Sequence, residues 1–399
     1  MPNTAKHYAV LDTESSIYQK GHPFAERNKL CLVGLRMDGV NHIFDIEYSD
    51  EPYGEKLVLI QELLDSIDLV VGFNIKFDLN WLSRYGIFLA DHVRVFDCQL
   101  AEFILNHQST PFPSLDDCCA KYGLGGKLDV VNTDYWSVGI DTPEIPMEIL
   151  GPYLEKDLEL TDGLYQQLCS HITQRNCGAL ANLHMQDLRV LQEMESNGIL
   201  LDWASMAAAG SAIEKELDEI NKAIISYAPE DSRGVFNTGS NDHVSLLLYG
   251  GTLVTKQASP YLHEYKSGPK AGTSEIRNKW ADISIQFPRL VDPLPKSALA
   301  KRGPNGEEIF WSTGADVLKE LPGPKKLLKL LLKQAELAKL LTTYYHGLAK
   351  KAEKMDWQDG FLHGQFNQCQ VVTGRLSSSN PNLQNLPEVM NEFIQSRYI

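Results

Sequence analysis

The feature that most constrains the fold is the alternation of strand and helix patterns in residues 1–175. HYAVLDTE, KLCLVGLRM and HIFDIEY alternate in the manner of strands, and DLVVGF is a short apolar strand. EKLVLIQELLDSI and NIKFDLNWLSRYG place apolar residues at helical spacing, and a last helix is predicted to open at Gly151-Pro152 and run through YLEKDLELTDGLYQQLCSHI. Strands that alternate with helices predict an α/β domain.

Helical patterns dominate from residue 176 onward. DLRVLQEMESNG ends in glycine, and WASMAAAGSAIEKELDEINKAIISYA and PKKLLKLLLKQAELAKLLTTYYHGLAKKAEK are long amphipathic patterns. Residues 251–310 are rich in Lys, Pro, Gly and Ser with little periodicity, so we expect a loop or a partly ordered insertion there. The sequence therefore predicts a second, mostly helical region over residues 176–365 and a separate segment over residues 366–399.

The charge is unevenly distributed along the chain. The net charge is −15, which by itself argues against a nucleic-acid partner. Residues 1–175 hold 13 Lys and Arg against 27 Asp and Glu, a net −14, and the remainder holds 24 against 25, a net −1. Within that remainder, residues 321–354 contain eight lysines and two glutamates. An acidic front half is thus joined to a back half with a basic helix.

Composition excludes several classes of protein. No apolar run reaches the ~18 residues that span a bilayer, and the amino terminus has no apolar signal region, so we expect no membrane partner and a cytoplasmic location. The seven cysteines are scattered without zinc spacing, which favours reduced, mostly buried thiols.

Two short motifs place acids at the ends of predicted elements. Asp12 and Glu14 end the first strand, and residues i and i+2 of a strand point to one face, so both carboxylates can meet one cation. Asn74 and Asp78 are four residues apart on the predicted helix after DLVVGF, so amide and carboxylate share a face. Taken singly, such pairs are more often a solvated strand end and a solvated helix.

A third pair makes the set more informative. Tyr153 and Asp157 in YLEKD are also four residues apart, although alone they would read as a packed tyrosine and an exposed aspartate. Three elements of one α/β domain could deliver acids to one point, and crowded carboxylates require cations between them. Oxygen ligands select Mg²⁺ or Mn²⁺, and two such ions ~4 Å apart promote in-line attack of water on a phosphodiester. The carboxylates in question are Asp12, Glu14, Asp78 and Asp157.

DTE, GFNIKFDLNWL and YLEKD, in this order, resemble the motifs of DEDD-type 3'-5' exonucleases with tyrosine in the third motif. The resemblance covers residues 1–175 and implies a ribonuclease H-like fold. It implies that Asp12 bridges two metals, that Glu14 and Asp157 bind the first and Asp78 the second, and that Tyr153 holds the attacking water. Asn74 would be a supporting contact, and Asp97 is interpreted as structural.

TGRLSSSNPNLQNLP, within a closing run that reads as a loop, is similar to the segment that opens the palm of family A DNA polymerases, which are DNA polymerase I-like. MESNGILLD, FNTGSNDHVSLLLYG, STGADVLKEL and the lysine-rich helix resemble the thumb of that family, in order. The resemblance implies that Arg375 reaches the minor groove at the primer terminus. It also implies further contacts to DNA from Asn382, Gln384, Lys325, Lys326, Lys329 and Lys333; a solvated helix face is the alternative for the lysines.

The departure from the family pattern shapes the functional hypotheses. Because 24 residues follow Arg375, we expect the palm carboxylates and the fingers lysine of the family to be missing, whether the gene is divided, as is plausible in a bacteriophage, or the sequence is truncated. The main hypothesis is a metal-dependent proofreading 3'-5' exonuclease that grips primer-template DNA and works with a second polypeptide carrying palm and fingers. The alternatives are a DNA-binding assembly subunit with little activity alone and, less favoured, a ribonuclease of the same superfamily.

Overall fold

The computed structural model describes residues 7–294, 299–302 and 308–395. The chain divides into two compact units, one of residues 1–203 with 348–399 (unit 1) and one of residues 204–347 (unit 2). These units differ from the segments expected from the sequence, because residues 176–203 and 348–365 pack with the exonuclease-like region. A division by contacts need not coincide with the boundary of a family domain. The end of the exonuclease domain at residue 175 therefore stays a prediction.

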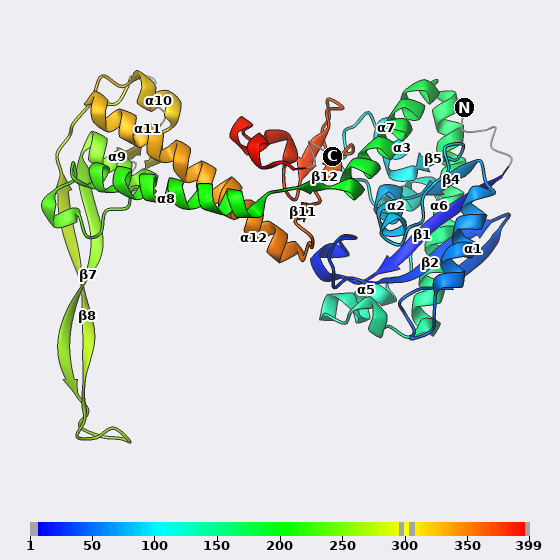
Figure 1. The fold of residues 1–399 in the computed structure, drawn as a ribbon, viewed down its shortest axis with the longest axis horizontal. Helices are drawn as coiled ribbons and strands as arrows, with labels where there is room; N and C mark the ends of the chain where they lie inside the picture. The colour runs from blue at the N-terminus through cyan, green and yellow to red at the C-terminus, as the bar shows by residue number, and fades with distance from the viewer. Residues whose placement is uncertain (1–6, 295–298, 303–307, 396–399) are drawn as a thin grey trace. The chain divides into compact units, whose positions relative to one another are not determined.

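Unit 1 is built on a five-stranded sheet of order β3-β2-β1-β4-β5 (Figure 1). β1 pairs antiparallel with β2 and parallel with β4, and β4 pairs parallel with β5. These strands realise the apolar patterns of the sequence, since β1, β2 and β4 are almost entirely buried. Their bounds are β1 Tyr8–Ser15, β2 Leu30–Met37, β3 Val40–Asp45, β4 Leu69–Gly72 and β5 Arg94–Asp97.

Seven helices of unit 1 accompany this sheet in the described part of the chain: α1 Gly54–Asp65, α2 Ile75–Arg84, α3 Cys98–Leu105, α4 Leu115–Tyr122, α5 Val130–Asp134, α6 Met147–Gln174 and α7 Gly178–Asn197. The long helix α6 begins earlier than predicted, because Pro146 is its N-cap residue and Pro152 lies inside it. α7 ends at Gly198, whose φ of 64° lies in the left-handed region that glycine favours.

A single apolar core unites the sheet with helices from both sides of residue 175. Trp81 and Phe103 are fully buried in it, and α7 contributes Met185 and Leu188. Cys369 belongs to the same core although it lies almost two hundred residues beyond α6. All seven cysteines are free thiols, and six are buried, as predicted.

The closing part of unit 1 is more regular than the loop predicted for it. β11 (Phe361–Leu362) pairs with β6 (Ile199–Leu200), and β12 (Gln365–Asn367) pairs with β13 (Ser377–Ser379). Two 3₁₀ helices follow, η7 (Leu383–Asn385) and η8 (Glu388–Phe393). The serine run therefore forms a short strand, which the sequence did not indicate because serine has no apolar alternation to reveal it.

Unit 2 is mainly helical, as predicted. Its core joins α9, α10 and α11, with Leu247, Leu318 and Leu327 buried together. The lysine-rich pattern is interrupted by a π-helical turn, η6 (Leu340–Tyr345), between α11 and α12. The helices of unit 2 are α8 Trp203–Ile225, α9 Asn241–Tyr249, α10 Ala315–Glu320 and α11 Lys325–Lys339, and α12 His346–Met355 lies mostly in unit 1.

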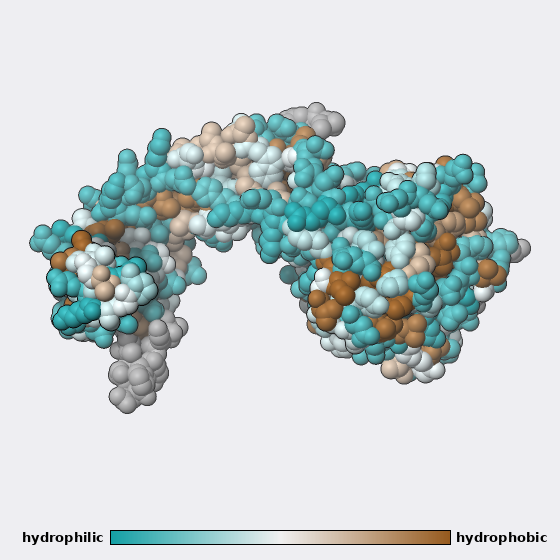
Figure 2. Space-filling view, turned by 90° about the horizontal axis from the view of Figure 1, so that it is seen from below, coloured by the Kyte–Doolittle hydropathy of each residue, from teal (hydrophilic) through white to brown (hydrophobic). Residues whose placement is uncertain are grey.

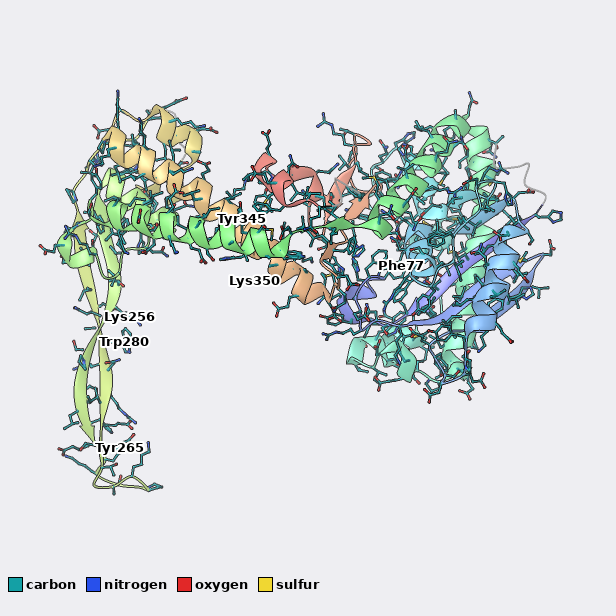
Figure 3. All side chains as sticks on the ribbon, viewed as in Figure 1. Phe77, Lys256, Tyr265, Trp280, Tyr345 and Lys350 are labelled. Carbon is teal, nitrogen blue, oxygen red and sulfur yellow. The ribbon has the colours of Figure 1, made fainter. Side chains whose placement is uncertain are left out.

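The stretch predicted as a loop at 251–310 is instead a long hairpin. β7 (Gly251–Glu264) and β8 (Ser274–Phe287) pair over their full length (Figure 1). Only the base of the hairpin is buried, for example Leu253 and Ile285, so most of each strand has no apolar alternation for a sequence reading to detect. Figure 3 shows Trp280 partway along the hairpin and Tyr265 at its far end. A second pair, β9 (Leu299–Arg302) with β10 (Glu308–Trp311), lies in the same stretch.

The surface of unit 1 is mostly polar. In the view of Figure 2, unit 1 is mainly hydrophilic with interspersed hydrophobic patches. No helix in the described ranges is both long and apolar enough to cross a membrane.

Candidate active site

β1 carries the first two acids at the centre of the sheet. Asp12 is the register partner of Gly34 on β2, so the two side-chain positions share one face of the sheet. A Cβ at Gly34 would lie 2.8 Å from Leu158 Cδ1 and 3.1 Å from Leu154 Cγ. The absence of a side chain at residue 34 therefore lets α6 approach the sheet on the face toward which Asp12 points.

α6 brings the third motif to this face. Tyr153 and Asp157 are both inside the helix and are buried, at 7% and 4% exposure, so the side-by-side arrangement predicted from their spacing is present. The ring of Tyr153 packs edge-on against Trp136 at 5.7 Å between centroids. The alternative interpretation, in which Tyr153 packs and Asp157 is exposed, is thus wrong for Asp157.

α2 brings the second motif. Asp78 is 3% exposed and accepts a hydrogen bond of 2.6 Å from the hydroxyl of Thr13 on β1. Asn74 is not part of the helix, because its φ of 57° makes it a left-handed residue at the N-cap. The prediction that its amide and Asp78 share a helix face is therefore wrong.

The four carboxylates perturb one another strongly. Burial and the neighbouring Asp157 carboxylate raise the pKa of Asp12 to about 7. Burial, followed by the charge of Asp12, raises the pKa values of Glu14 and Asp78 well above their ordinary range. Burial also raises the pKa of Asp157, although Lys127 opposes this shift. Burial is the first cause of each shift, and neighbouring acids of the set add to it for Asp12, Glu14 and Asp78.

Lys127 is the site residue that the sequence interpretation missed. Its Nζ lies 2.5 Å from Asp157 Oδ2 and 5.5 Å from the ring centroid of Tyr153. Burial lowers the pKa of Lys127, but Asp157, Asp12 and further acids more than offset this and raise it. Its one sequence signal is its place after the glycines of GLGGK, because glycine-rich segments often carry functional side chains.

The donor set fits a hard divalent cation. All four acids offer oxygen ligands, and Asp157 Oδ1 is buried without a hydrogen-bond partner. In the placement of residues 7–294, 299–302 and 308–395, no three Asp, Glu, His or Cys side chains already converge on one metal position. The four acids therefore have the chemistry that a divalent cation requires but are not arranged around one metal position, and an ammonium occupies one oxygen of Asp157.

Asp97 has a structural role, as interpreted from the sequence. It is the N-cap of α3 and accepts hydrogen bonds from Leu100 N at 2.9 Å and Ile75 N at 3.0 Å. It therefore fixes the start of both α3 and α2. Beside it lies a cavity of about 210 Å³ lined by Asn74, Phe77 and polar residues of the segment 363–369; Figure 3 marks Phe77.

The predicted DNA contacts lie in two separate places. Lys325, Lys326 and Lys329 are exposed on α11 of unit 2, opposite its buried leucines, and Lys333 is half-buried near Glu336 at 3.6 Å. In unit 1, Arg375, Asn382 and Gln384 are exposed, and Asn382 accepts a hydrogen bond of 3.1 Å from Gln384 N. The exposure leaves these side chains available to a ligand.

Comparison with known proteins shows similarity to two families. Residues 3–173 match the model of the 3'-5' exonuclease family, and residues 290–399 match that of DNA polymerase family A. DNA polymerase I of Synechocystis sp. is 27% identical over 320 residues, which cover 79% of this chain and 26% of that protein. DNA polymerase I of Borreliella burgdorferi is 27% identical over 387 residues, which cover 95% of this chain and 35% of that protein.

A solved structure shows the same fold. The polymerase domain of Pol1 from M. smegmatis, in complex with DNA primer-template and dNTP, superposes with a TM-score of 0.62 at 18% identity. The match covers 98% of this chain and 54% of that one. The chain thus combines a ribonuclease H-like exonuclease domain with a helical thumb and the first part of a polymerase palm. It is similar to family A DNA polymerases over most of its length and spans about a quarter to a third of the length of these curated relatives.

Proposed function

We propose that the chain hydrolyses 3'-terminal nucleotides of DNA, as the proofreading portion of a family A polymerase. One observation supports the proposal: Asp78 on α2 accepts a hydrogen bond from Thr13, which lies between Asp12 and Glu14 on β1, and α6, which carries buried Asp157, packs against the sheet at Gly34 beside Asp12. Burying uncompensated acids is costly unless a cationic partner offsets the cost. Cleavage of a phosphodiester by water is the chemistry that such an oxygen-rich site serves.

Each residue then has a distinct task. Asp12, Glu14 and Asp157 would hold one divalent cation, Mg²⁺ or Mn²⁺, and Asp78 a second. When bound, these ions supply the positive charge that eases deprotonation of water and departure of the 3'-oxygen. Tyr153, fixed by Trp136, orients the attacking water through its hydroxyl, because burial raises its pKa and keeps it protonated.

The experiment for this proposal is a gel assay on a 5'-labelled primer-template with Mg²⁺. We expect the primer to shorten from its 3' end and expect Asp12→Ala or chelation of the metal to abolish the shortening. Glu159→Gln is the matched control, because Glu159 lies on α6 two residues from Asp157 but is 49% exposed in its side chain. Activity unchanged in Asp12→Ala would refute the proposal, and added deoxynucleotides reveal any extension.

A second function is favoured by the lysine face of α11. We propose that Lys325, Lys326, Lys329 and Lys333 grip the phosphates of primer-template DNA and that Arg375, Asn382 and Gln384 approach its minor groove. Duplex affinity should fall with added salt. Lys325→Glu with Lys329→Glu should weaken binding and reduce the slope of that salt dependence by about one unit for each phosphate that is no longer neutralised. Lys222→Glu is a control, since Lys222 is exposed on α8 outside this face.

Three expectations remain: the ribonuclease alternative, the second polypeptide and the cellular location. The relatives are DNA polymerases, which counts against the ribonuclease alternative, and the assay with single-stranded DNA and RNA side by side tests it. The comparisons give no support for a second polypeptide that carries palm and fingers. A protein with these tasks would work in the cytoplasm of a bacterium or of a phage-infected cell.

A further inference from the structure

The candidate active site contains a cation of its own. Lys127 Nζ lies 2.5 Å from Asp157 Oδ2, with side chains 22% and 5% exposed. Its charge also lowers the pKa values of Asp12 and Glu14, against the larger effect of burial. The other oxygen of Asp157 has no hydrogen-bond partner. An ammonium and a divalent cation would therefore compete for the same carboxylate.

The segment that carries Lys127 is rich in glycine and has open space around its glycines. It joins α4 to α5 and contains Gly123, Gly125 and Gly126, none of which would bring a Cβ within 4 Å of another atom. Gly123 and Gly125 have φ values of 70° and 93°, in the region that glycine adopts readily. Its backbone is tethered at the surface, where Lys127 N donates to Asp116 Oδ1 at 3.2 Å. The side chain can thus withdraw without unpacking the core.

We propose that Lys127 is a tethered counter-cation, which neutralises Asp157 in the metal-free protein and leaves it when a divalent cation binds. This inference rests on the proposed metal-dependent exonuclease. In the absence of metal, the ammonium of Lys127 offsets part of the negative charge of the buried acids. By linkage, Lys127 stabilises the metal-free state and weakens metal binding by the same factor.

The alternative is a fixed ion pair that stays in place beside the metal. Both arrangements place a positive charge near the acids, so affinity alone does not separate them. They differ in the accessibility of the Lys127 amine. A displaced amine becomes reactive toward solvent reagents, whereas a fixed one stays protected.

The decisive experiment measures that accessibility in the unaltered chain. Amines are labelled with a lysine-reactive reagent in excess Mn²⁺ or in chelator, and peptide mass spectrometry gives the rate at each lysine. We expect labelling of Lys127 to rise about threefold or more with Mn²⁺, as expected for release from a partly buried ion pair. Labelling of Lys156, 34% exposed and next to Asp157 in sequence, should not change and serves as the internal control.

A variant provides a second readout that does not depend on activity. Lys127→Met keeps most of the side-chain volume and removes the charge, so calorimetric titration should show Mn²⁺ binding about tenfold tighter. The metal-free variant should melt at a lower temperature than the unaltered chain, and saturating Mn²⁺ should reduce the difference. Lys156→Met should match the unaltered chain in both measurements.

The outcomes separate the two proposals. Mn²⁺ binding with unchanged labelling of Lys127 would overturn the counter-cation proposal and leave the exonuclease standing. Absence of Mn²⁺ binding in both the unaltered chain and Lys127→Met would overturn both. Because the labelling experiment needs no variant, a Lys127→Met protein that fails to fold would not remove the test.

Discussion

A buried ion pair attaches the helix that carries Asp78 to the carboxyl-terminal part of unit 1. Lys76 Nζ on α2 lies 2.6 Å from Glu195 Oε1 on α7, and the two side chains are 15% and 5% exposed. Glu195 also accepts hydrogen bonds from Phe366 N on β12 at 2.6 Å and from Asn80 Nδ2 at 2.9 Å. Lys76 additionally donates to the carbonyl oxygen of Phe366. One carboxylate thus joins three segments of the chain.

Glu195→Gln should destabilise α2 strongly. Glutamine keeps the shape of the side chain but leaves the Lys76 ammonium buried without a counter-charge, a change that costs about 3–5 kcal/mol. Hydrogen exchange of the α2 amides, Ile75–Arg84, is the assay, because it reports local opening in a chain with two units. Exchange should accelerate about 10²- to 10⁴-fold, since each 1.4 kcal/mol is a factor of ten.

The double variant Lys76→Met with Glu195→Gln distinguishes loss of the pair from loss of packing. Without the lysine no charge stays buried, and the one amide oxygen of glutamine can accept from Phe366 N or from Asn80 Nδ2, which bond different oxygens of Glu195. One of the two hydrogen bonds is lost, so α2 should regain protection to within about 1–2 kcal/mol of the unaltered chain. Lys121→Met is the control, because Lys121 pairs with buried Glu102 but is itself 47% exposed. Unchanged exchange of α2 in Glu195→Gln, or a double variant as unstable as the single, would refute the reasoning.

Three further predictions follow from single contacts. Gly34→Ala should lower the free energy of unfolding by about 1–3 kcal/mol in denaturant titration and slow the exonuclease, because a methyl group would collide with buried Leu158 of α6. Tyr153→Phe should retain stability but reduce single-turnover nuclease rates about 10²-fold if the hydroxyl orients water. Burial lowers the pKa of His22 to about 3, and its Nδ1 accepts from Phe24 N at 3.3 Å, so the unfolded state alone binds a proton between pH 6.5 and 3. The contribution of His22 to stability should therefore fall by about 2 kcal/mol from pH 7 to 5, whereas the raised pKa values of Asp12, Glu14 and Asp78 act in the opposite sense. The difference between His22→Gln and the unaltered chain, in unfolding measurements at both pH values, isolates the contribution of His22.

The sequence was informative where local pattern and burial agree. The strands β1, β2 and β4 contain the apolar runs YAVL, LCLV and LVVG. The interpretation of Asp12, Glu14, Asp78 and Asp157 as one site came from three motifs taken together and from the family resemblance, and it stays a prediction. The sequence was uninformative where a long-range contact decides the outcome. The glycine-rich segment between α4 and α5 places Lys127 beside Asp157, and no periodic pattern in the sequence indicates this contact. The prediction placed Asn74 inside the helix, but Asn74 has a left-handed backbone conformation. The helix therefore begins after Asn74, and the four-residue spacing to Asp78 does not put the two side chains on one helix face.

The hairpin β7–β8 was missed for a different physical reason. Prediction of a strand relies on one face being buried, and distal residues such as Trp280 and Ile276 are 61% and 76% exposed. Pro260 within β7 further weakens the pattern, although a two-stranded hairpin has edges that tolerate proline. Composition alone therefore could not distinguish this element from a loop.

A last prediction concerns the border between the nuclease and the rest of unit 1. The family match ends at residue 173, yet α7 buries Met185 and Leu188 in the nuclease core, and Glu195 pairs with Lys76. A protein of residues 1–175 would expose that apolar surface and leave Lys76 unpaired on the helix that carries Asp78. We expect its α2 amides to exchange at least about 10²-fold faster than in the whole chain, because the loss includes a buried ion pair. A chain ending after β6, at residue 203, should regain the α7 contacts but lack the Phe366 N–H donor to Glu195, and its protection should be intermediate. Equal protection in all three proteins would mean that the nuclease core is self-sufficient and that α7 is attached to it without stabilising it.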